Sequence, residues 1–343
     1  MLNMEVTHEG SMALYNRLLK DPPEGPMAPY KPLRPNAYTE KGKVLVAIVR
    51  SDDRSSGINE AISLLGELGP IVEGVRGEFL IKPNCNTDDP YPRDTHPGTI
   101  RAIAENLLGA GVPAERIVLG ETSGRARGLP THHTMENLGM LEVAEELGLE
   151  VCFFEEDKWV TVKPPGAAAW PEGIKIPRRV YDAERVILAP IMRPHSTATF
   201  TISLKLAVGM LDSVGREWLH DGHAHHEKVV DLNLAYSADL VVADAAKILV
   251  DKELTTGKAA EPGIIIASGS RVASDAVSVA LMRLHGVDRV VERPVWEHEQ
   301  FKVAKSRDLG PSGLEGIALR TSNLAGDPGF EETVTGIERE LEG

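Results

Sequence analysis

The chain has 343 residues, of which 42% are hydrophobic and 26% are charged, proportions that are ordinary for a globular protein with a sizeable core. Its formal net charge of −14 argues against non-specific binding to nucleic acid or to an anionic membrane. No apolar run is long enough to span a membrane, and the first ten residues do not resemble a secretory signal. We therefore expect a cytoplasmic protein that binds neither nucleic acid nor membrane.

The first 42 residues are rich in proline and show little hydrophobic periodicity. They predict an irregular extension with one short helix near residues 11–19, which could wrap the domain or join two copies in a homodimer. From residue 43 onward, short apolar strands alternate with helices, a pattern typical of a mostly parallel sheet. The predicted fold is a three-layer α/β sandwich over residues 43–343, with a Pro- and Trp-containing insertion at 155–180.

The first candidate site follows the predicted strand at residues 79–82. Lys82 ends this strand, Asn84 and Asn86 follow it, and a helix is expected from Pro97, directly after His96. A cation and two carboxamides at a strand end, opposite a helix start, are typical of ligand sites in open α/β sheets. We expect Lys82, Asn84 and Asn86 to bind substrate. The alternative is a lysine that merely precedes an Asx-rich turn.

A second candidate follows the predicted strand at residues 116–119, where a turn runs from Gly120 to Gly124. Backbone N–H groups of such a turn can surround an anion, and Glu121 and Ser123 could contact a substrate. The turn matches no nucleotide-binding motif. A plain Gly-bounded turn is the alternative interpretation.

Cationic residues follow the predicted strand at residues 185–189. Arg193 and His195 would reach the same sheet edge as Lys82, and Lys205 lies in an otherwise apolar helix expected over residues 201–211. A buried lysine is costly unless it is paired or its pKa is lowered for chemistry. A lysine on a solvated helix face is the alternative.

Four of the eleven histidines fall within residues 220–226. Imidazoles beside carboxylates suit zinc, nickel, iron or manganese, and we expect His220, His223, His225 and Asp244 as metal ligands. The alternatives are an exposed polar loop, or a His220 that acts as an acid, a base or an anion donor. Farther along, Asp275 is expected to cap a helix over residues 273–284, and residues 294–305 are expected to form the last sizeable helix.

These motifs together resemble domain of unknown function family 362 over about residues 43–285. The matching segments are Lys82-Pro83-Asn84, Thr95-His96-Pro97, Gly120–Gly124, Arg193-Pro194-His195, Lys205 with Gly209, and Asp275. The resemblance implies an α/β fold and a site at these segments but no reaction, because the family's activity is not established. This chain lacks the ferredoxin-type cysteine module of many relatives, since its two cysteines are Cys85 and Cys152.

The residues favour an enzyme that acts on a small carboxylate or phosphate metabolite, with metal-assisted acid/base chemistry as one version. In this interpretation His96, His195, His220 and Lys205 transfer protons, while Arg193 and the residues around Lys82 bind the anion. One alternative is a redox or metal- or cluster-maturation protein. Another is a non-catalytic protein that binds the same anion.

Overall fold

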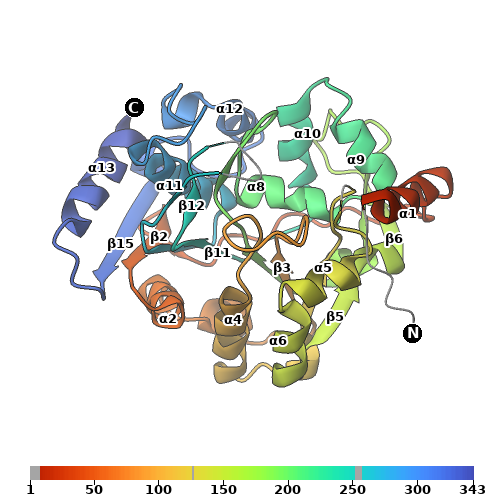
Figure 1. The fold of residues 1–343 in the computed structure, drawn as a ribbon. Helices are drawn as coiled ribbons and strands as arrows, with labels where there is room; N and C mark the ends of the chain where they lie inside the picture. The colour runs from red at the N-terminus through yellow and green to blue at the C-terminus, as the bar shows by residue number, and fades with distance from the viewer. Residues whose placement is uncertain (1–7, 126, 252–256) are drawn as a thin grey trace.

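A nine-stranded sheet runs through the centre of the molecule (Figure 1). The computed structural model describes residues 8–125, 127–251 and 257–343. The strand order is β1-β2-β14-β11-β8-β3-β4-β5, with β15 on the other side of β2. The strands are β1 (Thr39–Glu40), β2 (Lys43–Arg50), β3 (Phe79–Pro83), β4 (Ile117–Glu121), β5 (Glu150–Phe153), β8 (Arg185–Ala189), β11 (Leu240–Ala245), β14 (Ile264–Ser268) and β15 (Ile317–Asn323).

The sheet is mostly parallel, as the sequence predicts. Strands β11, β8, β3, β4 and β5 are parallel to one another, as is β15 to β2. Strand β14 is antiparallel to both β11 and β2, and β1 is antiparallel to β2. All residues of β3, β4, β11 and β14 are buried, which accounts for their apolar sequences in a sheet covered on both faces. Parallel strands also place their carboxyl ends at one edge, where ligand sites form in this class of fold.

Helices cover both faces of the sheet and bury two separate hydrophobic clusters. In Figure 1, α2 (Arg54–Leu65), α4 (Pro97–Gly109) and α6 (Met140–Leu147) lie below the sheet. Above it lie α8 (Ser203–Leu206), α10 (His225–Leu232), α11 (Arg271–Leu284) and α12 (Glu299–Ser306). The remaining helices are α1 (His8–Lys20), α3 (Gly69–Val72), α5 (Thr131–Asn137), α7 (Arg178–Asp182), α9 (Ser213–Leu219) and α13 (Phe330–Glu342). The predicted three-layer α/β class is confirmed.

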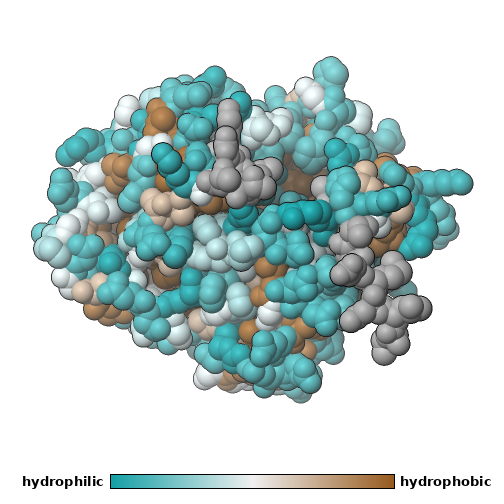
Figure 2. Space-filling view, in the orientation of Figure 1, coloured by the Kyte–Doolittle hydropathy of each residue, from teal (hydrophilic) through white to brown (hydrophobic). Residues whose placement is uncertain are grey.

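Figure 2 shows one face as mainly hydrophilic, with hydrophobic residues in small scattered groups. Among the described residues, no helix is both long enough and apolar enough to cross a membrane.

The N-terminal segment packs against the chain near residues 155–180. There, β6 (Trp159–Val162) and β7 (Ile174–Pro177) form an antiparallel hairpin, and Thr161 exchanges backbone hydrogen bonds with Pro26 and Ala28. Helix α1 contacts a different part of the chain, the loop after β4, where the Ser11 hydroxyl donates to the Arg125 carbonyl over 2.8 Å.

Between β8 and α9 the structure differs from the expected helix over residues 201–211. A hairpin of β9 (Arg193–His195) and β10 (Thr199–Thr201) lies outside the main sheet, and α8 and a 3-10 turn, η3 (Ala207–Met210), follow it. The expectation that Asp275 caps its own helix is wrong, because the Ser270 side chain caps α11. Asp275 instead accepts hydrogen bonds from the backbone N–H groups of Ser203 and Leu204, each over 2.9 Å, and so starts α8.

The expected last helix is also wrong. Residues 295–306 form a 3-10 turn, η4 (Val295–Glu297), and α12, but β15 and α13 follow them. Strand β15 is only partly buried and contains polar residues, so its sequence does not show the continuous apolar run of an inner strand. Two short strands, β12 (Ile248–Leu249) and β13 (Ala259–Ala260), form an antiparallel pair outside the main sheet.

Candidate functional site

Two neighbouring parallel strands bring Lys82 and Glu121 together at the carboxyl edge of the sheet. Lys82 lies in β3 and Glu121 ends β4, and their side chains form an ion pair with 2.5 Å between Nζ and Oε1. Both residues are buried, with 0% and 2% of their surface exposed. Burial lowers the pKa of Lys82 and raises the pKa of Glu121, and the attraction between the two charges opposes both shifts.

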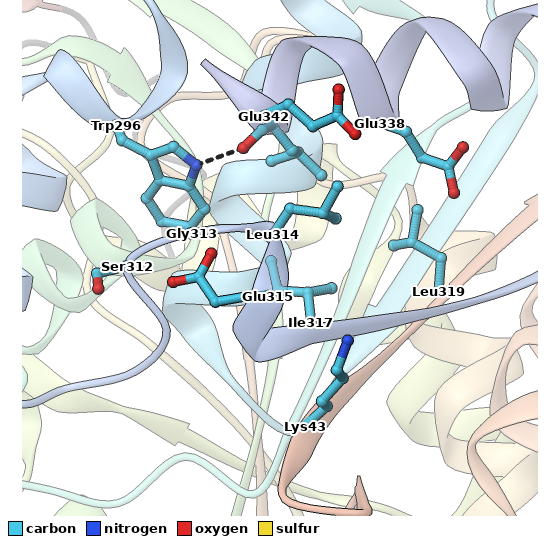
Figure 3. Close-up of a pocket in the computed structure, with 11 residues that line it drawn as sticks. Lys43, Trp296, Ser312, Gly313, Leu314, Glu315, Ile317, Leu319, Glu338 and Glu342 are labelled. Atoms are coloured by element: carbon cyan, nitrogen blue, oxygen red, sulfur yellow. Dashed lines mark hydrogen bonds between the residues drawn. The ribbon is translucent and has the colours of Figure 1, made fainter.

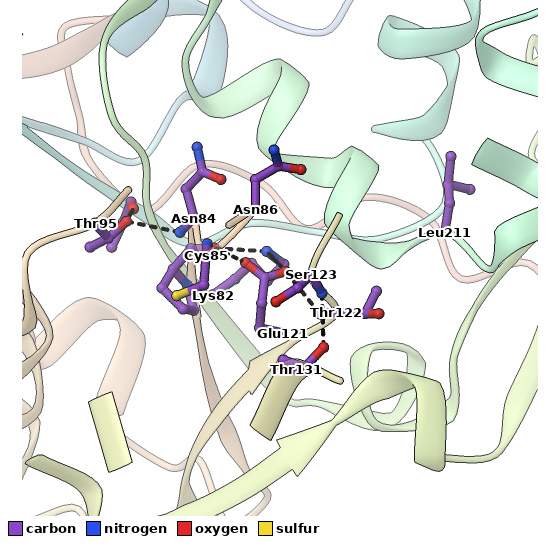
Figure 4. A network of polar contacts seen from close by, with 12 residues as sticks. Lys82, Asn84, Cys85, Asn86, Thr95, Glu121, Thr122, Ser123, Thr131 and Leu211 are labelled. Carbon is purple, nitrogen blue, oxygen red and sulfur yellow. Dashed lines mark hydrogen bonds and ion pairs between the residues drawn. The ribbon is translucent and has the colours of Figure 1, made fainter. Parts of the chain in front are cut away.

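Additional hydrogen bonds hold this buried pair in place (Figure 4). Lys82 Nζ donates to the Pro83 carbonyl over 2.7 Å, and Glu121 accepts from the backbone N–H groups of Cys85 and Thr122 over 2.9 Å and 2.8 Å. A buried ion pair persists only when its remaining polar groups are satisfied in this way. The pair is therefore a fixed part of the site.

Gly209 of η3 packs directly against the Lys82–Glu121 pair. A Cβ atom at this position would lie 2.5 Å from Glu121 Oε1 and 2.7 Å from Lys82 Nζ. A Cβ at such distances would force the buried Lys82–Glu121 pair to shift, so the close approach of η3 favours glycine.

The pair forms one wall of a pocket of about 60 Å³. The residues that line it are Lys82, Asn84, Asn86, Glu121, Thr122, Arg193, Thr201, Lys205, Leu206, Val208, Gly209 and Arg216. The structure thus brings together six residues that the sequence predicts for the site, namely Lys82, Asn84, Asn86, Glu121, Arg193 and Lys205. The pocket contains four cationic side chains and one carboxylate.

Two of the four cations are paired within the protein and two are not. Lys82 is paired with Glu121, and the Arg216 guanidinium donates to the carbonyls of Ser123 and Thr122 over 2.5 Å and 2.7 Å. Across the described part of the chain, neither Lys205 nor Arg193 has a hydrogen bond or an ion pair through its side chain. Burial, together with the positive charges of Arg193 and Arg216, lowers the pKa of Lys205 to about 7.

Arg216 and Thr201, which line the pocket, and Asp94 beside it were not identified from the sequence. Arg216 lies in a short helix outside every motif, and Thr201 ends β10 with its hydroxyl buried and without a hydrogen-bond partner in the described residues. Asp94 lies in the loop before α4, where it accepts from the Asn86 N–H over 2.7 Å. Burial raises the pKa of Asp94 to about 7, and the nearby charge of Arg193 opposes that shift.

Three histidines lie near Lys205, whose charge adds to the lowering of each pKa. His195 Nδ1 accepts from the backbone N–H groups of Thr197 and Ala198, each over 3.1 Å, so its Nε2 carries the proton. Burial is the main cause that lowers the pKa of His195 to about 2 and that of His225 to about 4, and it also lowers the pKa of His220. These imidazoles are neutral at physiological pH.

The expected metal set of His220, His223, His225 and Asp244 is not assembled. The rings of His220 and His225 lie 5.5 Å apart, but the His223 side chain is 89% exposed. Asp244 instead accepts from Arg54 Nε over 2.6 Å, and also from the hydroxyls of Tyr91 and Thr99. Within residues 8–125, 127–251 and 257–343, no group of three His, Cys, Asp or Glu side chains could hold a metal ion.

Two other predicted site residues face away from the pocket. The His96 ring packs edge-on against Tyr91, and its Nδ1 accepts from the Gly98 N–H over 2.9 Å, so His96 caps α4. Ser123 lines a separate cavity of about 20 Å³ on the other side of Arg216.

The Gly120–Gly124 turn does not surround an anion. Its N–H groups are already used within the protein, by the Glu121 carboxylate, by Thr131 Oγ1 and by the Asn86 carbonyl. Any anion in the neighbouring pocket is therefore bound by side chains.

A larger pocket of about 630 Å³ lies near the C-terminus, between η5 (Leu314–Gly316), β15 and α13 (Figure 3). Its charged residues, Lys43, Glu315, Glu338 and Glu342, are exposed, and Leu314, Ile317, Leu319 and Leu341 form its apolar part. None of these residues lies at the carboxyl edge of the parallel strands. The smaller pocket is the better candidate, because buried and unpaired charges are concentrated there.

Comparisons with known proteins agree with the motifs. The family model "Domain of unknown function (DUF362)" matches residues 79–280. A thylakoid-associated protein of Synechocystis sp. is 25% identical over 257 residues, which cover 70% of this chain and 74% of that protein. The cytoplasmic location expected for this chain stays a prediction. The structure of a lactate racemase apoprotein from Thermoanaerobacterium thermosaccharolyticum aligns with a TM-score of 0.37 and 11% identity, over 67% of this chain and little more than half (56%) of that one.

Proposed function

The chain belongs to the family of the domain of unknown function DUF362, and because that family names no reaction, we propose a function from the pocket itself. The protein is proposed to be an enzyme that binds a small carboxylate or phosphate anion between Arg193 and Lys205 and transfers a proton there. The family match covers residues 79–280, which include every cation of the pocket.

The single observation that carries this proposal is that the buried side chains of Lys205 and Arg193 form no hydrogen bond or ion pair among the described residues, while Asp94 attracts the Arg193 charge only from beyond ion-pair distance. An unpaired buried charge costs several kcal/mol, and proteins keep such charges mainly where they act on a ligand. An anion in the pocket would pair with both side chains. The volume of about 60 Å³ has room for about four water molecules, which suits a small metabolite or the anionic end of a larger one.

Lys205 is the proposed proton-transfer group. Its pKa of about 7 leaves the amine ready to gain or lose a proton at neutral pH, the condition under which general acid–base catalysis is most effective. A bound anion favours the protonated amine, which can then donate that proton to the substrate and take it back. The Lys82–Glu121 pair fixes the opposite wall of the pocket.

This proposal uses side chains alone. His220 and His225 supply two imidazoles, fewer than the three protein ligands that catalytic zinc sites usually have. A non-catalytic binding protein would contain the same anion site, so the two functions differ only in whether Lys205 transfers a proton.

Calorimetric titration of acetate, malonate, sulfate and phosphate tests the proposal, with Lys205→Met and Arg193→Gln as variants. Lys305→Met, which changes an exposed lysine of α12, is the matched control. We expect at least one anion to bind the wild type and the control equally, and to bind each pocket variant roughly tenfold or more weakly. Equal binding to all four proteins, or binding to none, would overturn the proposal.

A further inference from the structure

We infer that the group held in this pocket is a tetrahedral dianion, such as the phosphoryl group of a phosphorylated metabolite, rather than a monocarboxylate. This inference rests on the proposed function and assigns the substrate class of the same site.

The charges of the pocket favour a ligand with two negative charges. Four cations and one carboxylate line it, and the carboxylate of Glu121 is already paired with Lys82. Of the other three cations, Arg216 is hydrogen-bonded to two carbonyls, whereas Lys205 and Arg193 make no ion pair among the residues that the structure describes. The Asp94 carboxylate attracts the Arg193 charge only from beyond ion-pair distance. A ligand with two negative charges would pair with both Lys205 and Arg193, whereas a monoanion would leave one of these buried side chains without an ion pair, which is costly.

Several side chains of the pocket have hydrogen-bonding groups without partners in the described residues. Arg193 Nε and Thr201 Oγ1 are buried and have no partner in the described residues, and Lys205 likewise makes no hydrogen bond there. The side-chain amides of Asn84 and Asn86 are also unbonded within the described chain, and Figure 4 shows both pointing in the same direction, away from the strand ends.

These groups come from four separate segments of the chain. Asn84 and Asn86 follow β3, Arg193 begins β9, Thr201 ends β10 and Lys205 lies in α8. Donors that approach from several segments suit three or four oxygens in a tetrahedron better than the two coplanar oxygens of a carboxylate. Because no backbone N–H of the nearby glycine turn is free, discrimination depends on these side chains.

The test compares dianions with monoanions at one ionic strength and at roughly pH 6, where Lys205 is protonated. Sulfate and selenate are titrated against acetate and nitrate, using the full chain as wild type, Arg193→Gln and Thr201→Val. The control is Arg339→Gln, an exposed arginine of α13. Circular dichroism and melting temperature show whether each variant is folded.

We expect the wild type and the control to bind both dianions roughly tenfold or more tightly than either monoanion. Arg193→Gln should reduce this preference to within about threefold, and Thr201→Val should weaken sulfate more than acetate. Acetate or nitrate binding as tightly as sulfate, with the loss in Lys205→Met retained, would overturn the dianion assignment alone. Absence of binding by all four anions would overturn the proposed function as well.

Discussion

At the scale of single residues, the fold treats two buried lysines in opposite ways. Lys228 donates to the Asp221 carboxylate over 2.6 Å and to the Trp218 carbonyl over 2.7 Å, so its charge is compensated. Lys205 has neither kind of partner among the described residues, and its neighbours Arg193 and Arg216 repel it. The apolar sequence around Lys205 could suggest burial, but nothing in it could reveal that the two charges acting on Lys205, those of Arg193 and Arg216, are both positive.

The cost of this arrangement predicts that Lys205→Met stabilises the empty protein. Removing an unpaired buried cation should raise the free energy of unfolding by about 1–2 kcal/mol at neutral pH. The pKa of Lys205 is about 7 in the folded protein and 10.5 ordinarily, so the charge penalty is full below pH 7 and disappears as pH rises toward 10.5. Urea unfolding of both proteins between pH 6 and pH 10 should show the advantage of Lys205→Met shrinking. A variant less stable than the wild type at pH 6 would contradict the account.

Gly209 gives a second prediction at this scale. In Gly209→Ala the new methyl group would displace the buried Lys82–Glu121 pair, and we expect a loss of about 3 kcal/mol in unfolding free energy. Gly109→Ala is the control, because no atom lies within 4 Å of a Cβ at that helical position. Denaturant unfolding measures both, and equal effects of the two changes would argue against the close contact.

At the scale of elements, Asp275 connects α11 to α8 and so positions Lys205. Its carboxylate accepts from the Ser203 hydroxyl and from two N–H groups at the start of α8. The expected helix over residues 201–211 was wrong because a carboxylate 72 residues away in the chain determines where α8 begins. Periodicity within a short window does not contain that information.

Asp275→Asn should therefore weaken both stability and anion binding. The amide nitrogen would face a backbone N–H group, so we expect a loss of about 1–3 kcal/mol in unfolding free energy. Asp288→Asn, which alters an exposed aspartate, should leave both quantities unchanged. Calorimetry at a temperature where both variants are folded would show a weakened affinity in Asp275→Asn alone; unchanged affinity would mean that α8 keeps its position without this contact.

At the scale of the whole molecule, the sheet accounts for what the sequence could predict. Continuous apolar runs identify the inner strands, and parallel strands bring the residues that follow them to one edge, which is why Arg193 and His195 were expected at the same edge as Lys82. The local structure outside the main sheet was not predicted. Arg193 and Lys205 enter the pocket through a hairpin and a short helix, while Asp244 joins Arg54 and Tyr91 instead of the histidines.

The affinity of the cationic pocket for sulfate should depend on pH. Sulfate stays a dianion across the neutral range, so its affinity should fall as pH rises from about 6 to about 8, where Lys205 loses its proton. The groups that act on the charge of Lys205 are Arg193 and Arg216. The nearby His195 and His225, with pKa values of about 2 and about 4, stay neutral in this range, and burial lowers the pKa of His220 below its ordinary value. Asp94, whose pKa is raised by burial to about 7 and whose charge interacts with Arg193, also loses a proton in this range. Calorimetry should therefore show a steep fall in the wild type and a shallower one in Lys205→Met; the same slope in both would assign the whole fall to another group.

The most direct measurement is a crystal structure of the wild-type protein grown with selenate, a tetrahedral dianion whose anomalous scattering locates it without ambiguity. We expect the anomalous peak of a bound selenate in the pocket, with selenate oxygens within hydrogen-bond distance of Lys205 Nζ, Arg193 Nε and Thr201 Oγ1. Water alone in this pocket, at a selenate concentration that fills other sites on the molecule, would contradict the claim that these side chains hold an anion.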